Sequence, residues 1–152
     1  MAGLFQFSEA VSLALHGLKI MARNPDSIYT AKDLARNLKA SEAHLTKVFR
    51  RLVKNGLVTS HRGPHGGFML RKKPDEITLL EIFTAIEGDI CRLDECPLIK
   101  NDCPFGDCIF SGLLCRFQHE FRDFISCKTL EDFVSHSNGS NIKLPKTRAA
   151  VY

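Results

Sequence analysis

The chain has no tryptophan and only 2 tyrosines in 152 residues, so its bulky apolar side chains are mainly its 11 phenylalanines. No run reaches the ~18 consecutive apolar residues of a membrane-spanning helix. The apolar stretch 5–21 is interrupted by Glu9, His16 and Lys19, and it lacks the basic start and the cleavage site of a secretory signal. There is also no phosphate-binding nucleotide loop and no catalytic constellation. These absences favour a soluble cytoplasmic protein without a membrane partner, and not an enzyme.

Acidic residues are scarce in the first half of the chain. Residues 1–72 carry 12 Lys and Arg against 4 Asp and Glu, a net charge of +8, whereas residues 73–152 carry 9 against 13, a net charge of −4. A basic half followed by an acidic half suggests an anion-binding module joined to another element. Nucleic acid is the leading candidate for the anion.

The basic half predicts three helices, over residues 7–23, 31–38 and 42–54, from the helical spacing of its apolar residues. Thr30 and Ser41 stand where N-caps are expected. The first helix is apolar on two faces. One face would pack on its own core, and the other is a candidate contact with a partner subunit.

A hairpin is expected after these helices. Two short extended segments, Leu57–His61 and Phe68–Arg71, enclose a basic, glycine-rich turn over residues 62–67. Two short helices, a turn and such a hairpin form a winged helix-turn-helix. The predicted fold class is therefore mainly α, with a two-stranded wing.

The winged helix predicts a DNA contact surface. The second helix of a helix-turn-helix lies in the major groove with its first residues at base edges, and a basic wing tip can enter a narrow minor groove. Arg62 is the candidate for that insertion. A solvated basic helix face and a plain β-turn are the alternatives. The expected DNA-binding residues are Ser41, His44, Leu45, Thr46, Lys47, Arg50, Arg51, Arg62, Gly63, His65 and Gly66.

The acidic half predicts a helix over residues 77–87, a cysteine-rich loop, a long helix over 109–126 and a short helix over 129–134. The long helix carries one apolar stripe, which favours dimerisation. The stripe consists of Phe110, Leu113, Leu114, Phe117, Phe121, Phe124 and Ile125. The expected domains are a DNA-binding domain (1–88), a cluster-binding loop (89–108), a dimerisation helix with the final short helix (109–136) and a flexible tail (137–152).

All six cysteines lie in the acidic half, and four of them fall within 18 residues. Cys91, Cys96, Cys103 and Cys108 follow a C-x4-C-x6-C-x4-C pattern in a segment containing proline and glycine. Structural zinc sites usually contain a tighter knuckle pair, and no C-x2-C occurs here. The wider spacing favours an iron–sulfur cluster. Zinc and metal-free thiols remain the alternatives, and Cys115 and Cys127 are expected to be ordinary thiols.

Residues 54–58 (KNGLV) and 62–68 (RGPHGGF) resemble the wing signature of the IscR/NsrR-type family of winged-helix regulators. The first helix, the helix-turn-helix and the cysteine loop before a long helix are also similar, over about residues 4–135. The resemblance implies a homodimeric transcription regulator that binds palindromic operators in double-stranded DNA. It also implies, as in many members, a [2Fe-2S] or [4Fe-4S] cluster.

The family's three cysteine ligands match Cys96, Cys103 and Cys108, although spacings of five and five appear here as six and four. Cys91 is then an extra thiol, which is a fourth ligand, a replacement for Cys96, or a bystander. His16 matches a histidine ligand of some members, and it is the second candidate for the fourth ligand. Its alternative is a packed helix histidine.

Overall fold

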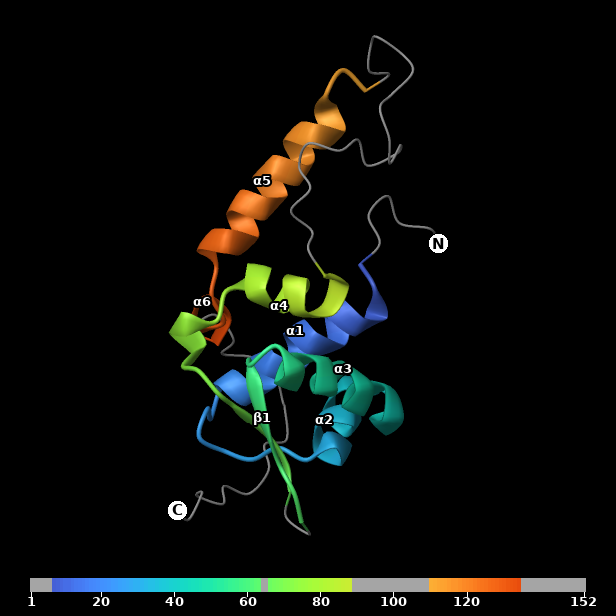
Figure 1. Cartoon of the computed structure of the whole chain (residues 1–152), viewed down its shortest axis with the longest axis vertical. Helices are drawn as coiled ribbons and strands as arrows, with labels where there is room; N and C mark the ends of the chain where they lie inside the picture. The colour runs from blue at the N-terminus through green and yellow to red at the C-terminus, as the bar shows by residue number, and fades with distance from the viewer. Residues whose placement is uncertain (1–6, 64–65, 89–109, 135–152) are drawn as a thin grey trace.

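The computed structural model describes residues 7–63, 66–88 and 110–134 (Figure 1). Within these ranges the protein is mainly helical and has one two-stranded antiparallel sheet, as predicted. The elements are α1 (Glu9–Ala22), α2 (Ala31–Leu38), α3 (Glu42–Lys54), β1 (Val58–His61), β2 (Gly67–Leu70), the 3-10 turn η1 (Pro74–Glu76), α4 (Leu79–Glu87), α5 (Leu113–Cys127) and α6 (Glu131–Val134). No helix in these ranges is long and apolar enough to cross a membrane.

Side-chain caps begin four of the helices. Each capping oxygen accepts a hydrogen bond from the backbone N–H three residues later, which satisfies a group that the helix itself leaves unpaired. α2 ends with Lys39 at a φ of 52°, a left-handed conformation that allows the tight turn into α3. The caps are Ser8 for α1, Thr30 for α2, Ser41 for α3 and Thr78 for α4.

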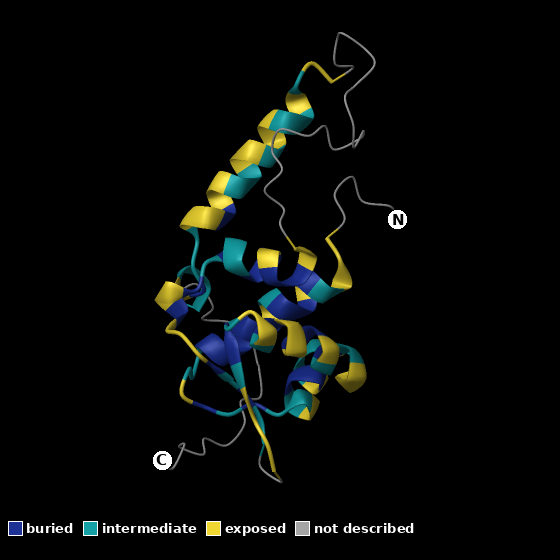
Figure 2. Cartoon of the chain, viewed as in Figure 1, coloured by how far each residue is buried: buried dark blue, intermediate teal, exposed yellow. Residues whose placement is uncertain are grey.

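Helix α1 lies at the centre of the core and packs against α2, α3 and α4. Its buried residues include Leu13 and Ile20, on the face expected to meet a partner subunit. That expectation is wrong for these two side chains, because the protein's own chain covers both. His16, on the same face, is exposed rather than packed. Figure 2 shows the buried residues gathered on α1, α4 and the inner side of α3.

The wing is joined to the segment between α1 and α2. Tyr29 and Phe68 exchange two backbone hydrogen bonds, both 2.8 Å, and the buried ring of Phe68 packs 5.0 Å from that of Phe49. A Cβ atom at Gly67 would lie 2.4 Å from the Tyr29 carbonyl oxygen, so only glycine permits this approach. The root of the wing is thereby fixed to the core.

Helix α5 extends away from the rest of the described fold (Figure 1). Ile125 is its one buried residue, and Leu130, just before α6, is also buried. The ring of Phe121 packs 5.5 Å from that of Phe83 and 5.6 Å from that of Phe7. The predicted stripe is therefore divided into an inner part that meets the core and an outer part that faces solvent.

Candidate nucleic-acid interface

The outward face of α3 presents Lys47 and Arg50, both exposed. Within the described part of the chain, neither side chain has a hydrogen bond or ion pair. Thr46 donates a 2.8 Å hydrogen bond to the Glu42 carbonyl, and His44 Nδ1 lies 3.5 Å from the Glu9 carboxylate. Lys47 and Arg50 are thus available to an anionic partner.

Two residues expected at the DNA surface have other roles. Leu45 is completely buried in the core, so it cannot touch a base edge. The Arg51 guanidinium donates to the Ile86 carbonyl at the end of α4. It therefore joins α3 to α4, while Arg51 stays exposed and the expected phosphate contact stays a prediction. The bond spans 35 positions in the sequence, beyond the reach of a local pattern.

The described part of the wing tip presents Arg62 and Gly63, which are both exposed. Gly63 has a φ of 109°, which favours glycine, and its carbonyl accepts a 2.9 Å hydrogen bond from Gly66 N–H. These contacts place Arg62 at the outer end of the hairpin. His65, also expected at this surface, lies outside the described residues.

A groove runs between the start of α2, the outward face of α3 and the wing, which lie together in the lower half of Figure 1. Arg50 and Arg62 line it from two sides. Sequence reasoning missed Lys32 and His61, which add basic groups to its walls. Lys32 lies in the first turn of α2, two residues after the Thr30 cap. This position in the sequence is the signal from which its place on the groove wall could have been predicted. The groove offers several cationic groups along one channel.

The four candidate cluster cysteines, Cys91, Cys96, Cys103 and Cys108, lie outside the described residues. Among the residues that are described, no three histidine, cysteine or acidic side chains come together as a metal site. His16 is exposed, and its Nδ1 lies 2.7 Å from the Ser12 carbonyl oxygen. A carbonyl only accepts, so Nδ1–H donates, and Nε2 keeps its lone pair in the neutral ring. The donor chemistry of His16 therefore fits a ligand role.

The sequence model of the Rrf2 family, described as iron-dependent transcriptional regulators, matches residues 7–136. The chain belongs to this family. A helix-turn-helix-type transcriptional regulator of Aquifex aeolicus is 33% identical over 132 residues, which cover 85% of this chain and 91% of that protein. The regulator IscR of Pectobacterium atrosepticum is 31% identical over 111 residues, covering 72% and 66% of the two chains.

Solved structures of Rrf2-type regulators have the same fold. CymR, the global cysteine regulator of B. subtilis, has a TM-score of 0.71 at 25% identity, covering 89% of this chain and all of that chain. T. potens IscR has a TM-score of 0.71 at 20% identity, covering 93% and 95%. These comparisons identify this Rrf2 protein as a winged-helix transcription regulator and not an enzyme.

Proposed function

We propose that this Rrf2 protein binds a palindromic operator as a homodimer and senses through an iron–sulfur cluster bound by its cysteine loop. The observation that carries the DNA-binding part is the groove whose two sides present Arg50 of α3 and Arg62 of the wing. In winged helices the second helix of the motif enters the major groove. A wing arginine inserted into the minor groove reads its width and negative potential.

The expected roles of the α3 residues depend on their position along the helix. Ser41 caps α3, and His44, Thr46 and Lys47 lie in its first half, where side chains reach base edges. Arg50 lies further along the helix and is suited to phosphate.

Replacing Arg62 with alanine should weaken specific operator binding by about 1–3 kcal/mol, or roughly 5- to 150-fold, because a good groove contact is lost. The measurement is fluorescence anisotropy with operator and scrambled duplexes at several salt concentrations. Arg71→Ala, at the root of the same hairpin, is the charge-matched control. An unchanged operator affinity in Arg62→Ala would exclude the minor-groove role. Equal losses on both duplexes would reduce Arg62 to a phosphate contact.

The homodimer is supported by the outer apolar stripe of α5. Leu113, Phe117 and Phe124 lie on one face of the helix and are 45–53% exposed. Large apolar side chains in a contiguous exposed row mark an interaction surface. A second copy of α5, related to the first by a two-fold axis, would cover the outer stripe of each subunit in a single contact.

The cysteine loop supplies the donor set for the cluster. Thiolates are the usual ligands of iron–sulfur clusters, and Cys96, Cys103 and Cys108 are the proposed ligands. Cys91 or the Nε2 atom of His16 would complete the set. When bound, such a cluster supplies an iron centre whose chemical state changes with oxidants, nitric oxide or iron supply.

Cys103→Ala or Cys108→Ala should abolish cluster binding, since these two proposed ligands enclose the four residues 104–107 and are the nearest of the four candidates, in sequence, to the long helix. Cys115→Ala is the matched control, because Cys115 lies on α5 itself and should leave the cluster intact. Iron content, sulfide content and visible absorption are measured on anaerobic preparations. Full iron loading in Cys103→Ala would show that the ligand assignment is wrong. A colourless parent with one zinc per chain, or with no metal, would favour a zinc-binding or bare-thiol regulator instead.

A further inference from the structure

The wing and α5 are connected through a small set of polar contacts beside α4, which is called the joint below. The chain just before α4 pairs with the α5–α6 connection, where Thr78 and Thr129 face each other in an antiparallel bridge. Leu79 N–H donates to the Lys128 carbonyl, and Leu130 N–H donates to the Ile77 carbonyl, both at 2.9 Å. The C-terminal end of α5 is therefore attached to the start of α4.

The backbone N–H of each threonine donates to the carboxylate of the acidic residue three positions later. Glu81 accepts from Thr78 N–H at 2.9 Å, and Asp132 accepts from Thr129 N–H at 2.8 Å. Each carboxylate also contacts a lysine, Lys72 for Glu81 and Lys128 for Asp132. Two threonine–carboxylate contacts thus lie on the two sides of the bridge, and the one at Thr78 also caps α4.

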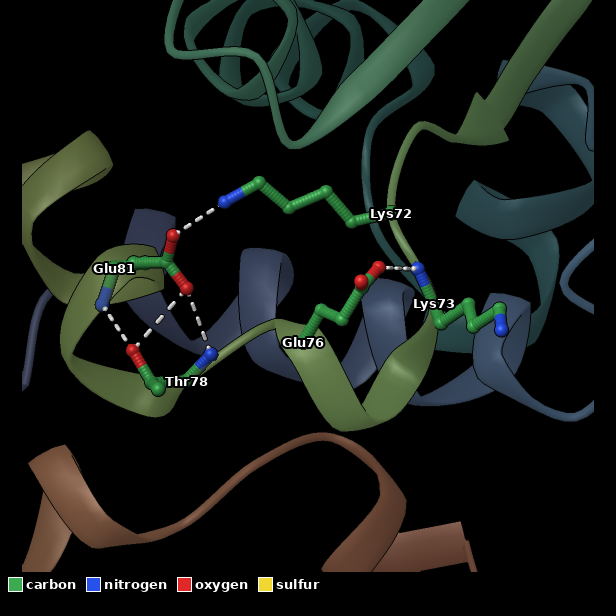
Figure 3. A network of polar contacts seen from close by, with 5 residues as sticks. All are labelled: Lys72, Lys73, Glu76, Thr78 and Glu81. Atoms are coloured by element: carbon green, nitrogen blue, oxygen red, sulfur yellow. Dashed lines mark hydrogen bonds and ion pairs between the residues drawn. The ribbon is translucent and has the colours of Figure 1, made fainter.

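Glu81 has a further contact that reaches the wing. Its other carboxylate oxygen lies 2.6 Å from Lys72 Nζ (Figure 3), and Lys72 follows the last residue of β2, Leu70, by two positions. Burial acts to raise the pKa of the Glu81 carboxyl, but hydrogen bonds from Lys72 and Thr78 outweigh it and the pKa is lowered. Glu81 is therefore charged at neutral pH, and it bonds both Lys72 at the wing root and Thr78 at the start of α4.

We propose that Glu81 is a positioning residue, which ties the root of the wing to the α5–α6 connection and so sets the placement of Arg62 relative to the α5 helix. The chain of contacts runs from β2 to Lys72, Glu81, Thr78 and Thr129. This inference rests on the proposed DNA-binding function only for its consequence at the operator. Whether these contacts hold the wing root and the α5–α6 connection together can be measured in the free protein, without DNA.

Some substitutions weaken the contact between Glu81 and Lys72 but keep the contact between Glu81 and Thr78 that caps α4. Glutamine at this position still accepts from Thr78 N–H, since the capping motif tolerates it, so Glu81→Gln weakens mainly the ion pair with Lys72. Lys72→Met removes the same ion pair from the other side. Glu76→Gln and Lys73→Met are the matched controls. Glu76 accepts from Lys73 N–H at 3.0 Å, a contact at the start of η1 that is separate from the Lys72–Glu81–Thr78 contacts (Figure 3).

The first experiment is a double-mutant cycle on operator affinity with Arg62→Ala, using the full chain. If Glu81 places the wing, the fold-loss caused by Arg62→Ala should shrink about 2- to 10-fold in Glu81→Gln and in Lys72→Met, and not in their controls. Equal losses from Arg62→Ala in all backgrounds would overturn the proposal and leave the DNA-binding function standing. A general rise in affinity for all duplexes in Glu81→Gln, additive with Arg62→Ala, would also overturn it, because Glu81 would then only neutralise Lys72.

The second experiment is amide hydrogen exchange of the free protein, which does not depend on DNA. Glu81→Gln should speed exchange at the Arg71 amide, bonded to the Leu57 carbonyl at the wing root, and at the Leu130 amide of the joint. Glu76→Gln should leave both unchanged. Unchanged protection at both amides in Glu81→Gln overturns the proposal, even if Arg62→Ala shows no operator effect and the DNA-binding proposal itself fails.

Discussion

A double variant, Phe117→Asp with Phe124→Asp, should be monomeric at concentrations where the parent protein is a dimer. Both rings are about half exposed on α5, on the face of the outer stripe. In a seam between two copies of α5, the same carboxylates would be buried without partners, which costs several kcal/mol for each group. Sedimentation velocity gives the oligomeric state, and circular dichroism confirms that the helices remain.

The control for this variant is His119→Asp with Ser126→Asp. Both residues are exposed on α5, and helical spacing places them on the opposite side from Phe117 and Phe124. This control adds two aspartates to the same helix and should remain dimeric. A well-folded dimer of the phenylalanine variant would remove the outer stripe from the interface. Phe121 is left unchanged, because its ring packs against Phe83 inside the subunit.

Gly67→Ala should lower the free energy of unfolding by about 1–3 kcal/mol, the usual range when a packed site is overfilled. The added methyl group would meet the Tyr29 carbonyl oxygen at 2.4 Å and the Tyr29 carbonyl carbon at 2.8 Å. Both are backbone atoms in a hydrogen-bonded pair, so no side chain can rotate away to relieve the contact. Urea unfolding followed by circular dichroism provides the measurement.

Ser60→Ala is the control for Gly67→Ala, since Ser60 is exposed on β1 of the same hairpin and pairs with Phe68. It should change the stability by less than about 0.5 kcal/mol. If Gly67→Ala is equally neutral, the wing root is not held against Tyr29 as closely as described. Loss of operator binding without loss of stability would instead mean that the wing moves while the core remains intact.

Sequence patterns predicted the helices and the hairpin because their causes are local. Thr30, Ser41 and Thr78 cap helices through the N–H group three residues later, and Gly56 ends α3 with a φ of 74°. Periodicity identified the apolar stripe of α5 but not what covers each part of it. The division between a core-facing Phe121 and the outer row depends on the position of α4, which no spacing within α5 reveals.

The candidate site was less predictable for the same reason. Leu45 was expected at the DNA, but the packing of α3 on α1 places it in the core. Arg51 lies beside Arg50 in the sequence, yet one guanidinium bonds a carbonyl of α4 and the other lines the groove. Charge alone does not distinguish them. Neighbouring elements, distant in the sequence, determine the contacts of each arginine.

The attachment of α5 at its C-terminal end also limits how this helix can change in length during evolution. Ile125 and the Thr129 bridge fix the last turn, so the direction in which the outer stripe points depends on the number of residues back from that anchor. One inserted residue would rotate everything before it by about 100° and carry the stripe away from its partner. Insertions of seven residues, or two complete turns, nearly restore the direction. Homologous α5 helices that keep this anchor and this stripe should therefore differ in length by steps of about seven residues.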